Sequence, residues 1–310
     1  MKNYPFDWKI KLTLWLMSRG PAPSAAASPQ FHALANESPP AFLYRRFTGV
    51  AFEDTSIPAQ HGSIPIRIYR PEGAGPRALI VYYHGGGFVL GGLESHHEIC
   101  RRLAAENRAI VVAVDYRLAP LNKYPAAVED AVTALGWASA HAAELNADPA
   151  RLVVMGDSAG GNLAAVVSLI ARDSGGPPLA LQVLIYPVVD LGGSYPSKET
   201  YDDIPILDRK ALDYYRDQYI RQAADLQDGH VSPILSEQLG NLPPALILTG
   251  EYDALRDEGQ AYAARLLSAG NAVTSACFPG MPHGFLSLGR MAGQTEAAFE
   301  QIKLSLSKNT

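Results

Sequence analysis

Hydrophobic positions along this chain of 310 residues gather in short uninterrupted runs, separated by longer stretches with helical spacing. Three runs are apolar throughout, and three later ones continue the series: residues 78–83, 109–114, 152–155, 181–186, 245–249 and 272–278. The intervening stretches predict helices at residues 98–106, 126–145, 161–171, 257–269 and 295–306. Continuous apolar strands that alternate with helices are typical of a mostly parallel sheet covered by helices on both faces. We therefore predict an α/β fold.

An earlier segment has a different pattern. Ile64, Ile66 and Ile68 alternate with Pro65 and Arg67, which predicts a half-exposed strand. Proline has no amide hydrogen to donate to a neighbouring strand, so Pro65 favours a position at the edge of the sheet.

The stretch from residue 191 to 228 breaks the alternation of strands and helices. It is rich in Tyr, Asp and Pro, and it carries one predicted helix at residues 209–220. Neither this stretch nor the N-terminal segment can bury a core by itself. We therefore expect a helical cap, formed by residues 1–45 and 191–228, over a catalytic domain formed by residues 46–190 and 229–310.

Composition restricts the kinds of partner. A hydrophobic fraction of 47% supports a sizeable core, and a net charge of −5 argues against nucleic acid as a partner. No apolar stretch approaches the length of about 18 residues that a membrane span needs, so we expect no stable membrane insertion.

The N-terminus weakly imitates a signal peptide, because an apolar run at residues 12–17 precedes three alanines at residues 25–27. Charged residues interrupt the segment before that run, however, and the pattern favours an amphipathic helix with Trp8, Leu12 and Trp15 on one face. The chain is accordingly expected to be cytoplasmic.

Cys100 and Cys277 form no metal-ligand pattern, and a reduced cytosolic setting is the simpler interpretation. Cys277 precedes Phe278 in a predicted strand, which predicts a small buried side chain. We expect neither a metal ion nor a cofactor.

The segment Gly156-Asp157-Ser158-Ala159-Gly160 lies between a predicted strand and a predicted helix. A serine on such a tight strand-to-helix turn is exposed above the sheet, and the turn closes only if the residues two before and two after it are nearly free of side chain. Ser158 is therefore the candidate nucleophile. The alternative, an ordinary helix N-cap serine, does not require the flanking glycines.

Three successive glycines follow the strand at residues 78–83, in the segment His84-Gly85-Gly86-Gly87-Phe88. Without a Cβ, their amides can point into a site, as an oxyanion hole for acyl transfer requires, and the amide of Ala159 would add a donor. A phosphate-binding loop is the alternative, but the segment lacks its lysine and its glycine spacing. His84 is expected to support this loop by hydrogen bonding.

The base and the acid are sought after the serine, because the triad of an α/β-hydrolase fold follows the chain order Ser, acid, His. Of the eight histidines, only His230 and His283 follow Ser158. His283 lies in a loop between the last strand and the last helix, and it leaves room for an acid at the end of the strand at residues 245–249. Asp253 is the leading acid, Glu251 is the alternative, and Asp257 is expected to cap the next helix.

In these motifs the chain resembles the bacterial hormone-sensitive-lipase-like esterases of the α/β-hydrolase superfamily, in the branch with a GDSAG motif. The matching segments span residues 78 to 290 in the family's order: residues 84–88, 115–120, 123–127, 156–162, 253–259 and 283–285. The chain departs from the family pattern at Ala254, where a proline is usual, and at Leu121 and Asn122. The first departure lies in the loop that carries the candidate acid Asp253, and the second lies in a connecting segment.

The resemblance implies a triad of Ser158, His283 and Asp253, with Gly86, Gly87 and Ala159 as oxyanion donors. It also implies a cap and no cofactor. Asp157 resembles the acidic position before the nucleophile in one branch, where it would order the turn and bear on substrate contacts. Gly85, Phe88, Leu207 and Tyr215 complete the candidate binding residues.

The expected function is hydrolysis of short- to medium-chain carboxylic esters through an acyl-enzyme, on a small-molecule ester. An amidase or deacetylase of the same mechanism is the nearest alternative, and a non-catalytic receptor or an interfacial lipase on the same scaffold are more distant ones. Relatives often dimerise through the last strand and helix, so a homodimer is possible.

Overall fold

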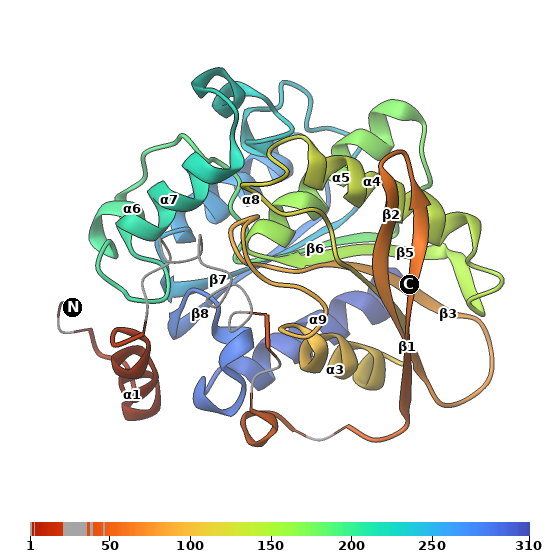
Figure 1. Cartoon of the computed structure of the whole chain (residues 1–310), viewed down its shortest axis with the longest axis horizontal. Helices are drawn as coiled ribbons and strands as arrows, with labels where there is room; N and C mark the ends of the chain where they lie inside the picture. Colours follow the sequence, from red (N-terminus) through yellow and green to blue (C-terminus); the bar gives the residue numbers. More distant parts are fainter. Residues whose placement is uncertain (1, 3, 21–35, 38–39, 46) are drawn as a thin grey trace.

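The structure is a computed structural model, and it describes residues 2, 4–20, 36–37, 40–45 and 47–310. Its centre is an eight-stranded sheet with the strand order β1-β2-β4-β3-β5-β6-β7-β8 (Figure 1). The strands are β1 (Val50–Ala59), β2 (Gly62–Pro71), β3 (Arg77–Tyr83), β4 (Ile110–Val114), β5 (Ala147–Asp157), β6 (Leu181–Ile185), β7 (Ala245–Tyr252) and β8 (Val273–Pro282).

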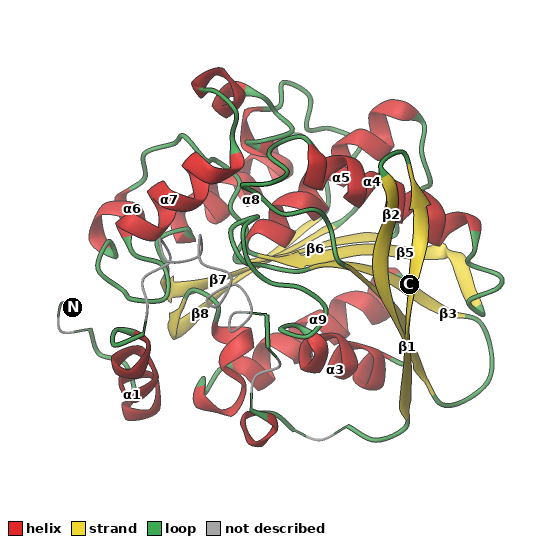
Figure 2. Ribbon diagram, in the orientation of Figure 1, coloured by secondary structure: helices red, strands yellow, loops and turns green. Residues whose placement is uncertain are grey.

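Helices lie on both faces of this sheet (Figure 2). The α-helices are α1 (Trp8–Met17), α3 (His97–Asn107), α4 (Ala126–Ala140), α5 (Ala159–Ser174), α6 (Pro196–Thr200), α7 (Arg209–Tyr219), α8 (Arg256–Ser268) and α9 (Thr295–Asn309). Apolar residues of α4, α5 and α8 form one core with the sheet, and those of α1, α3 and α9 form another core on the opposite face. The predicted α/β class is confirmed.

The six apolar runs all form strands, and β4, β3, β5, β6, β7 and β8 pair in parallel. Every residue of β3, β4 and β6 is buried, because helices cover both faces of the sheet at these strands. The predicted helix at residues 126–145 is shorter in the structure, since α4 ends at Ala140. Only β1 and β2 are antiparallel to their neighbours.

The predicted edge position of Pro65 is wrong. Pro65 lies in β2, which pairs with β1 on one side and with β4 on the other, so that β1 is the edge strand. The missing amide hydrogen of Pro65 is tolerated there, because the pairing of β2 with β4 begins only at Ile66, and just beyond it the Pro65 carbonyl accepts the Asp115 amide at 3.0 Å.

The N-terminal helix exists, but it packs through the face opposite to the one that carries Trp8, Leu12 and Trp15. Asp7 caps α1, and Ile10 and Leu14 are buried against the body of the protein. Trp8, Leu12 and Trp15 share the opposite face and are 69%, 42% and 46% exposed. The helix is apolar on both faces, so the sequence alone could not show which face packs.

Cys277 is also exposed, although a buried side chain was predicted. It lies on β8, which is an edge strand with helices covering it less completely than the central strands.

Segment 191–228 contains α6 and α7, beyond the carboxyl ends of the parallel strands (Figure 1). The N-terminal half of the predicted cap lies partly outside the described residues, as does the alanine run at residues 25–27. Among the helices that the structure does describe, none has the length and apolar character that crossing a membrane requires.

Candidate active site

Ser158 lies on the turn between β5 and α5, in a backbone conformation that side-chain-bearing residues rarely adopt. Its φ is 55° and its ψ is −116°. The turn is tight, because an added Cβ on Gly156 would lie 2.2 Å from the Gly160 carbonyl oxygen, and one on Gly160 would lie 1.9 Å from the Tyr83 carbonyl oxygen. Glycine is therefore required at both flanking positions, and the backbone is held in a strained geometry that presents the hydroxyl to the pocket.

The structure brings Ser158, His283 and Asp253 into one hydrogen-bonded chain. The Ser158 Oγ lies 2.9 Å from Nε2 of His283, and the His283 Nδ1 lies 2.9 Å from Oδ2 of Asp253. The other oxygen of Asp253 accepts the Leu255 amide at 2.8 Å, which fixes the carboxylate. All three residues follow carboxyl ends of parallel strands, β5, β8 and β7 respectively, so the topology places them on one edge of the sheet.

The rival residues lie elsewhere. His230 is exposed, and its amide bonds with Asp228 rather than with any residue of this chain of hydrogen bonds. The Glu251 carboxylate accepts the Gly280 amide at 2.7 Å, and so joins the end of β7 to β8 where the pairing of the two strands is irregular. Asp257 does not occupy the N-cap position of α8, which belongs to Leu255, but accepts the Ser197 amide from within the first turn.

Tyr186 follows β6 and was not singled out by the sequence analysis. It is fully buried with a φ of 36°, and its ring contacts the imidazole of His283 edge-on, with 4.8 Å between the ring centroids. This packing contact restricts the movement of the imidazole. The only signal in the sequence is its place at the end of a buried parallel strand.

The glycine loop lies beside the serine. Gly86 and Gly87 have φ values of 122° and 63°, and both line the pocket, as Gly85 does. Among the described residues, neither the Gly86 nor the Gly87 amide donates a hydrogen bond to the protein. Ala159 is the first residue of α5, where the amide has no partner within the helix. The Gly85 amide is different, because it donates to Asp157 at 2.9 Å.

Two tyrosines of α7 pack on this loop. The ring of Phe88 stacks on Tyr219 of α7 with 3.7 Å between centroids and an interplanar angle of 8°. An added Cβ on Gly87 would lie 2.3 Å from the Tyr215 ring, so α7 packs directly on the loop.

His84 supports the loop by a hydrogen bond and by ring packing. Its Nδ1 lies 2.8 Å from the Gly85 carbonyl oxygen, and its ring stacks on Tyr116, whose hydroxyl donates to the His84 carbonyl at 2.7 Å. Burial lowers the pKa of His84 to about 3, with the neighbouring His96 adding to the shift, so the ring is neutral. This is the supporting role expected from the sequence.

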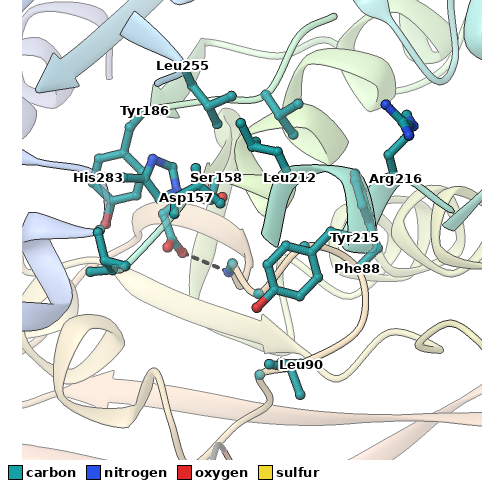
Figure 3. A pocket seen from close by; sticks show the side chains of 18 of the residues that line it. Phe88, Leu90, Asp157, Ser158, Tyr186, Leu212, Tyr215, Arg216, Leu255 and His283 are labelled. Atoms are coloured by element: carbon teal, nitrogen blue, oxygen red, sulfur yellow. Dashed lines mark hydrogen bonds between the residues drawn. The ribbon is translucent and has the colours of Figure 1, made fainter. Parts of the chain in front are cut away.

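A pocket of about 900 Å³ opens over Ser158 (Figure 3). The candidate binding residues Phe88, Leu207 and Tyr215 all line it, together with Val188, Ile206, Leu212 and Leu255. Arg209, Asp213 and Arg216 of α7 give it a polar stretch. The sequence analysis missed the α7 residues other than Tyr215, because helical spacing alone does not show which face of a cap helix meets the site.

The described residues hold no cluster of three or more His, Cys, Asp or Glu side chains that could bind a metal ion. What the pocket residues can do is acid–base and nucleophilic chemistry: an alcohol with a neighbouring imidazole, a carboxylate behind the imidazole, and amides beside the alcohol.

Comparisons with known proteins agree with this chemistry. A family model described as alpha/beta hydrolase fold matches residues 80–287. The chain is 44% identical over 255 residues to the carboxylic ester hydrolase LipN of Mycobacterium tuberculosis, covering 80% of this chain and 68% of that one. It is 40% identical to an arylesterase of Saccharolobus solfataricus, with 78% and 79% of the two chains covered. The solved structure of an esterase of Pyrobaculum calidifontis superposes with a TM-score of 0.88 at 38% identity, over 98% of this chain and 99% of the other.

Proposed function

The chain belongs to the α/β-hydrolase fold family, among its hormone-sensitive-lipase-like esterases, and we propose on this premise that it is a serine carboxylesterase whose triad is Ser158, His283 and Asp253. It hydrolyses carboxylic esters, as the relatives named above do. The observation that carries the assignment of residues is the pair of 2.9 Å contacts that link the serine hydroxyl, the imidazole and the carboxylate.

Acylation begins with attack of the Ser158 Oγ on the ester carbonyl carbon, while Nε2 of His283 accepts the hydroxyl proton. The carbonyl oxygen becomes an oxyanion. The C–O bond to the alcohol then breaks, and the imidazolium returns its proton to the leaving alkoxide, which leaves as the alcohol. A water molecule, deprotonated by His283, attacks the carbonyl carbon of the acyl-enzyme. The bond from that carbon to the Ser158 Oγ breaks, the imidazolium returns its proton to Oγ, and the carboxylic acid is released.

Asp253 keeps the imidazole in the productive tautomer, with Nδ1 protonated and Nε2 free to accept, and it stabilises the imidazolium. The amides of Gly86, Gly87 and Ala159 serve as donors to the oxyanion. Removal of one such donor costs about 3–4 kcal/mol of transition-state stabilisation in a comparable enzyme.

The substrate class proposed is short- to medium-chain esters. The pocket of about 900 Å³ has aliphatic and aromatic side chains in its lining, which suit an acyl chain, and α7 forms part of its wall. We also propose that the described parts of segment 1–45 join segment 191–228 as the cap, since Met17 and Glu37 line the pocket together with α7 residues.

The cellular setting and the assembly are proposals as well. Two free thiols, at Cys100 and Cys277, are compatible with the reducing cytoplasm. The outer edge of β8 could pair with a second copy, which would give a homodimer; light scattering of the purified protein measures this directly.

The test uses p-nitrophenyl butyrate with matched pairs of variants. Ser158→Ala and His283→Ala should lose turnover by about 10³-fold or more, whereas His230→Ala should keep it. Asp253→Asn should lose about 10³- to 10⁴-fold, whereas Glu251→Gln should stay close to wild type. Residual turnover near wild type in Ser158→Ala would refute the assignment. The corresponding p-nitroanilide distinguishes an esterase from an amidase.

A further inference from the structure

The carboxylate of Asp157 is buried immediately before the nucleophile, and it is not part of the proposed triad. Asp157 is 4% exposed, and three groups lie close to its Oδ1. The Tyr82 hydroxyl donates at 2.8 Å and the Gly85 amide at 2.9 Å, and the His96 Nε2 lies 3.3 Å from Oδ1 and also 3.3 Å from the Gly85 amide nitrogen. Figure 3 shows the bond from Asp157 to the loop.

The bond between Asp157 and Gly85 joins two strand ends. Gly85 follows β3 and Asp157 ends β5, and the two strands are neighbours, with Tyr83 opposite Gly156. The carboxylate therefore ties the glycine loop to the turn that carries the serine. The fit is close, because an added Cβ on Gly85 would lie 2.5 Å from Oδ2 of Asp157.

The charge on Asp157 makes it a strong acceptor. Burial alone would raise the pKa of this carboxyl, but the charge and hydrogen bond of His96 and the hydrogen bond of Tyr82 outweigh it, and the pKa is lowered. Hydrogen bonds to an ionised acceptor are about twice as strong as neutral ones. The Gly85 amide is thus held firmly in place. The amides of Gly86 and Gly87, which follow it in the loop, stay available to a substrate.

We propose that Asp157, held by Tyr82 and His96, is a positioning residue that fixes the oxyanion loop against Ser158 through the Gly85 amide. The proposal rests on the proposed esterase function. Asp157 acts through the loop, so its removal should weaken stabilisation of the transition state more than binding of the ester.

The experiment compares Asp157→Ala with Asp157→Asn. The alanine leaves the Gly85 amide with only the more distant Nε2 of His96, at 3.3 Å, as an acceptor, whereas the asparagine keeps an oxygen at the place of Oδ1. We expect kcat for p-nitrophenyl butyrate to fall about 30-fold or more in Asp157→Ala with KM changed less than about threefold, and to recover most of the way in Asp157→Asn.

A matched pair of tyrosines tests the support of the carboxylate. Tyr82→Phe removes one donor to Asp157 and should lower kcat several-fold. Tyr83→Phe removes an equally buried hydroxyl that donates instead to the Ala131 carbonyl, at 2.9 Å, and should leave kcat unchanged. Each rate is divided by the number of active sites titrated with a fluorophosphonate, so that loss of folded protein does not count as loss of kcat.

A second measurement reports the oxyanion directly. An alkyl trifluoromethyl ketone adds the Ser158 Oγ to its carbonyl carbon and carries the oxyanion, so its inhibition constant should rise in Asp157→Ala by the factor by which kcat/KM falls. Unchanged kcat in Asp157→Ala, an equal loss in Asp157→Asn, or an unchanged inhibition constant would each overturn the positioning role. Failure of the proposed function itself is recognised separately, as activity that survives Ser158→Ala.

Discussion

His84 shows how a single buried residue ties the stability of this fold to pH. Burial keeps the imidazole neutral down to a pKa of about 3, against an ordinary value of 6.5. The unfolded chain therefore takes up a proton near pH 6.5, while the folded protein does not. Because the unfolded state then binds more protons, the stability that depends on neutral His84 is fully present above pH 6.5 and is lost as the pH falls from there toward 3.

We expect this one group to cost the wild-type protein about 2 kcal/mol of unfolding free energy between about pH 7 and pH 5. His84→Asn removes the titrating ring. The unfolding free energy of this variant, measured with urea, should therefore fall by about 2 kcal/mol less than that of the wild type between about pH 7 and pH 5. His230→Ala removes an exposed histidine and should follow the wild type. Parallel losses in wild type and His84→Asn would contradict the argument.

At the same scale, the sequence predicted some site residues better than others. Ser158 and His283 were identifiable because each lies in a short motif whose geometry requires those residue types. Asp253 and Glu251 could not be separated by spacing, because both lie close to the carboxyl end of β7. The structure shows Asp253, just after the strand, beside the imidazole, and Glu251, within the strand, bonded to the Gly280 amide. Tyr186 was missed, because no motif marks a residue that acts by packing against His283.

At the scale of elements, an ion pair joins the short helix α6 to α8. The Nζ of Lys198 lies 2.6 Å from Oε2 of Glu258, and both side chains are buried. The other Glu258 oxygen accepts the amides of Val189 and Asp190, so one carboxylate holds the chain after β6 as well as α6. Burial outweighs the attraction of Lys198 and raises the pKa of Glu258.

Breaking this pair from one side should be costly. Lys198→Met leaves Glu258 buried without its cation, and we expect a loss of about 3–5 kcal/mol in unfolding free energy. The double variant Lys198→Met with Glu258→Gln removes the stranded charge and should be more stable than the sum of the single losses indicates. Urea denaturation of the four proteins measures the coupling, and strictly additive losses would show that the pair is not a unit.

Elements differed in how well the sequence predicted them, and burial explains the difference. The parallel strands were predictable because burial on both faces makes them apolar throughout. β1 was missed, because most of its residues are exposed at the sheet edge and its pattern is mixed. Pro65 was misplaced for a related reason: the sequence shows that an amide hydrogen is absent, but not that the neighbouring strand can do without it.

At the scale of the whole molecule, the strand order assembles the site. The sheet places β3 beside β5, so the glycine loop lies next to the serine, and β7 beside β8, so the acid lies next to the histidine. All four segments leave the sheet at its carboxyl edge, where ligands of parallel α/β sheets bind. The site therefore exists only when the complete parallel sheet has formed.

The two cysteines make it possible to measure whether the sheet opens as one cooperative unit. Cys277 is exposed on the edge strand β8, whereas Cys100 is fully buried in α3, where burial raises the pKa of its thiol well above the ordinary value. Under native conditions we expect one thiol to react rapidly with an aromatic disulfide reagent, and the rapid phase to vanish in Cys277→Ser.

The slow reaction of Cys100 should report opening of the whole fold. Its helix packs on β2 and β4 within the hydrophobic core of that face of the sheet, so reagent reaches the thiol only when that core opens. The reaction rate should then rise with urea as steeply as the equilibrium population of unfolded protein does. Modification of Cys277 should leave ester hydrolysis unchanged, because Cys277 does not line the pocket. A Cys100 rate that rises less steeply than global unfolding would show instead that α3 opens locally while the sheet, and with it the site, stays intact.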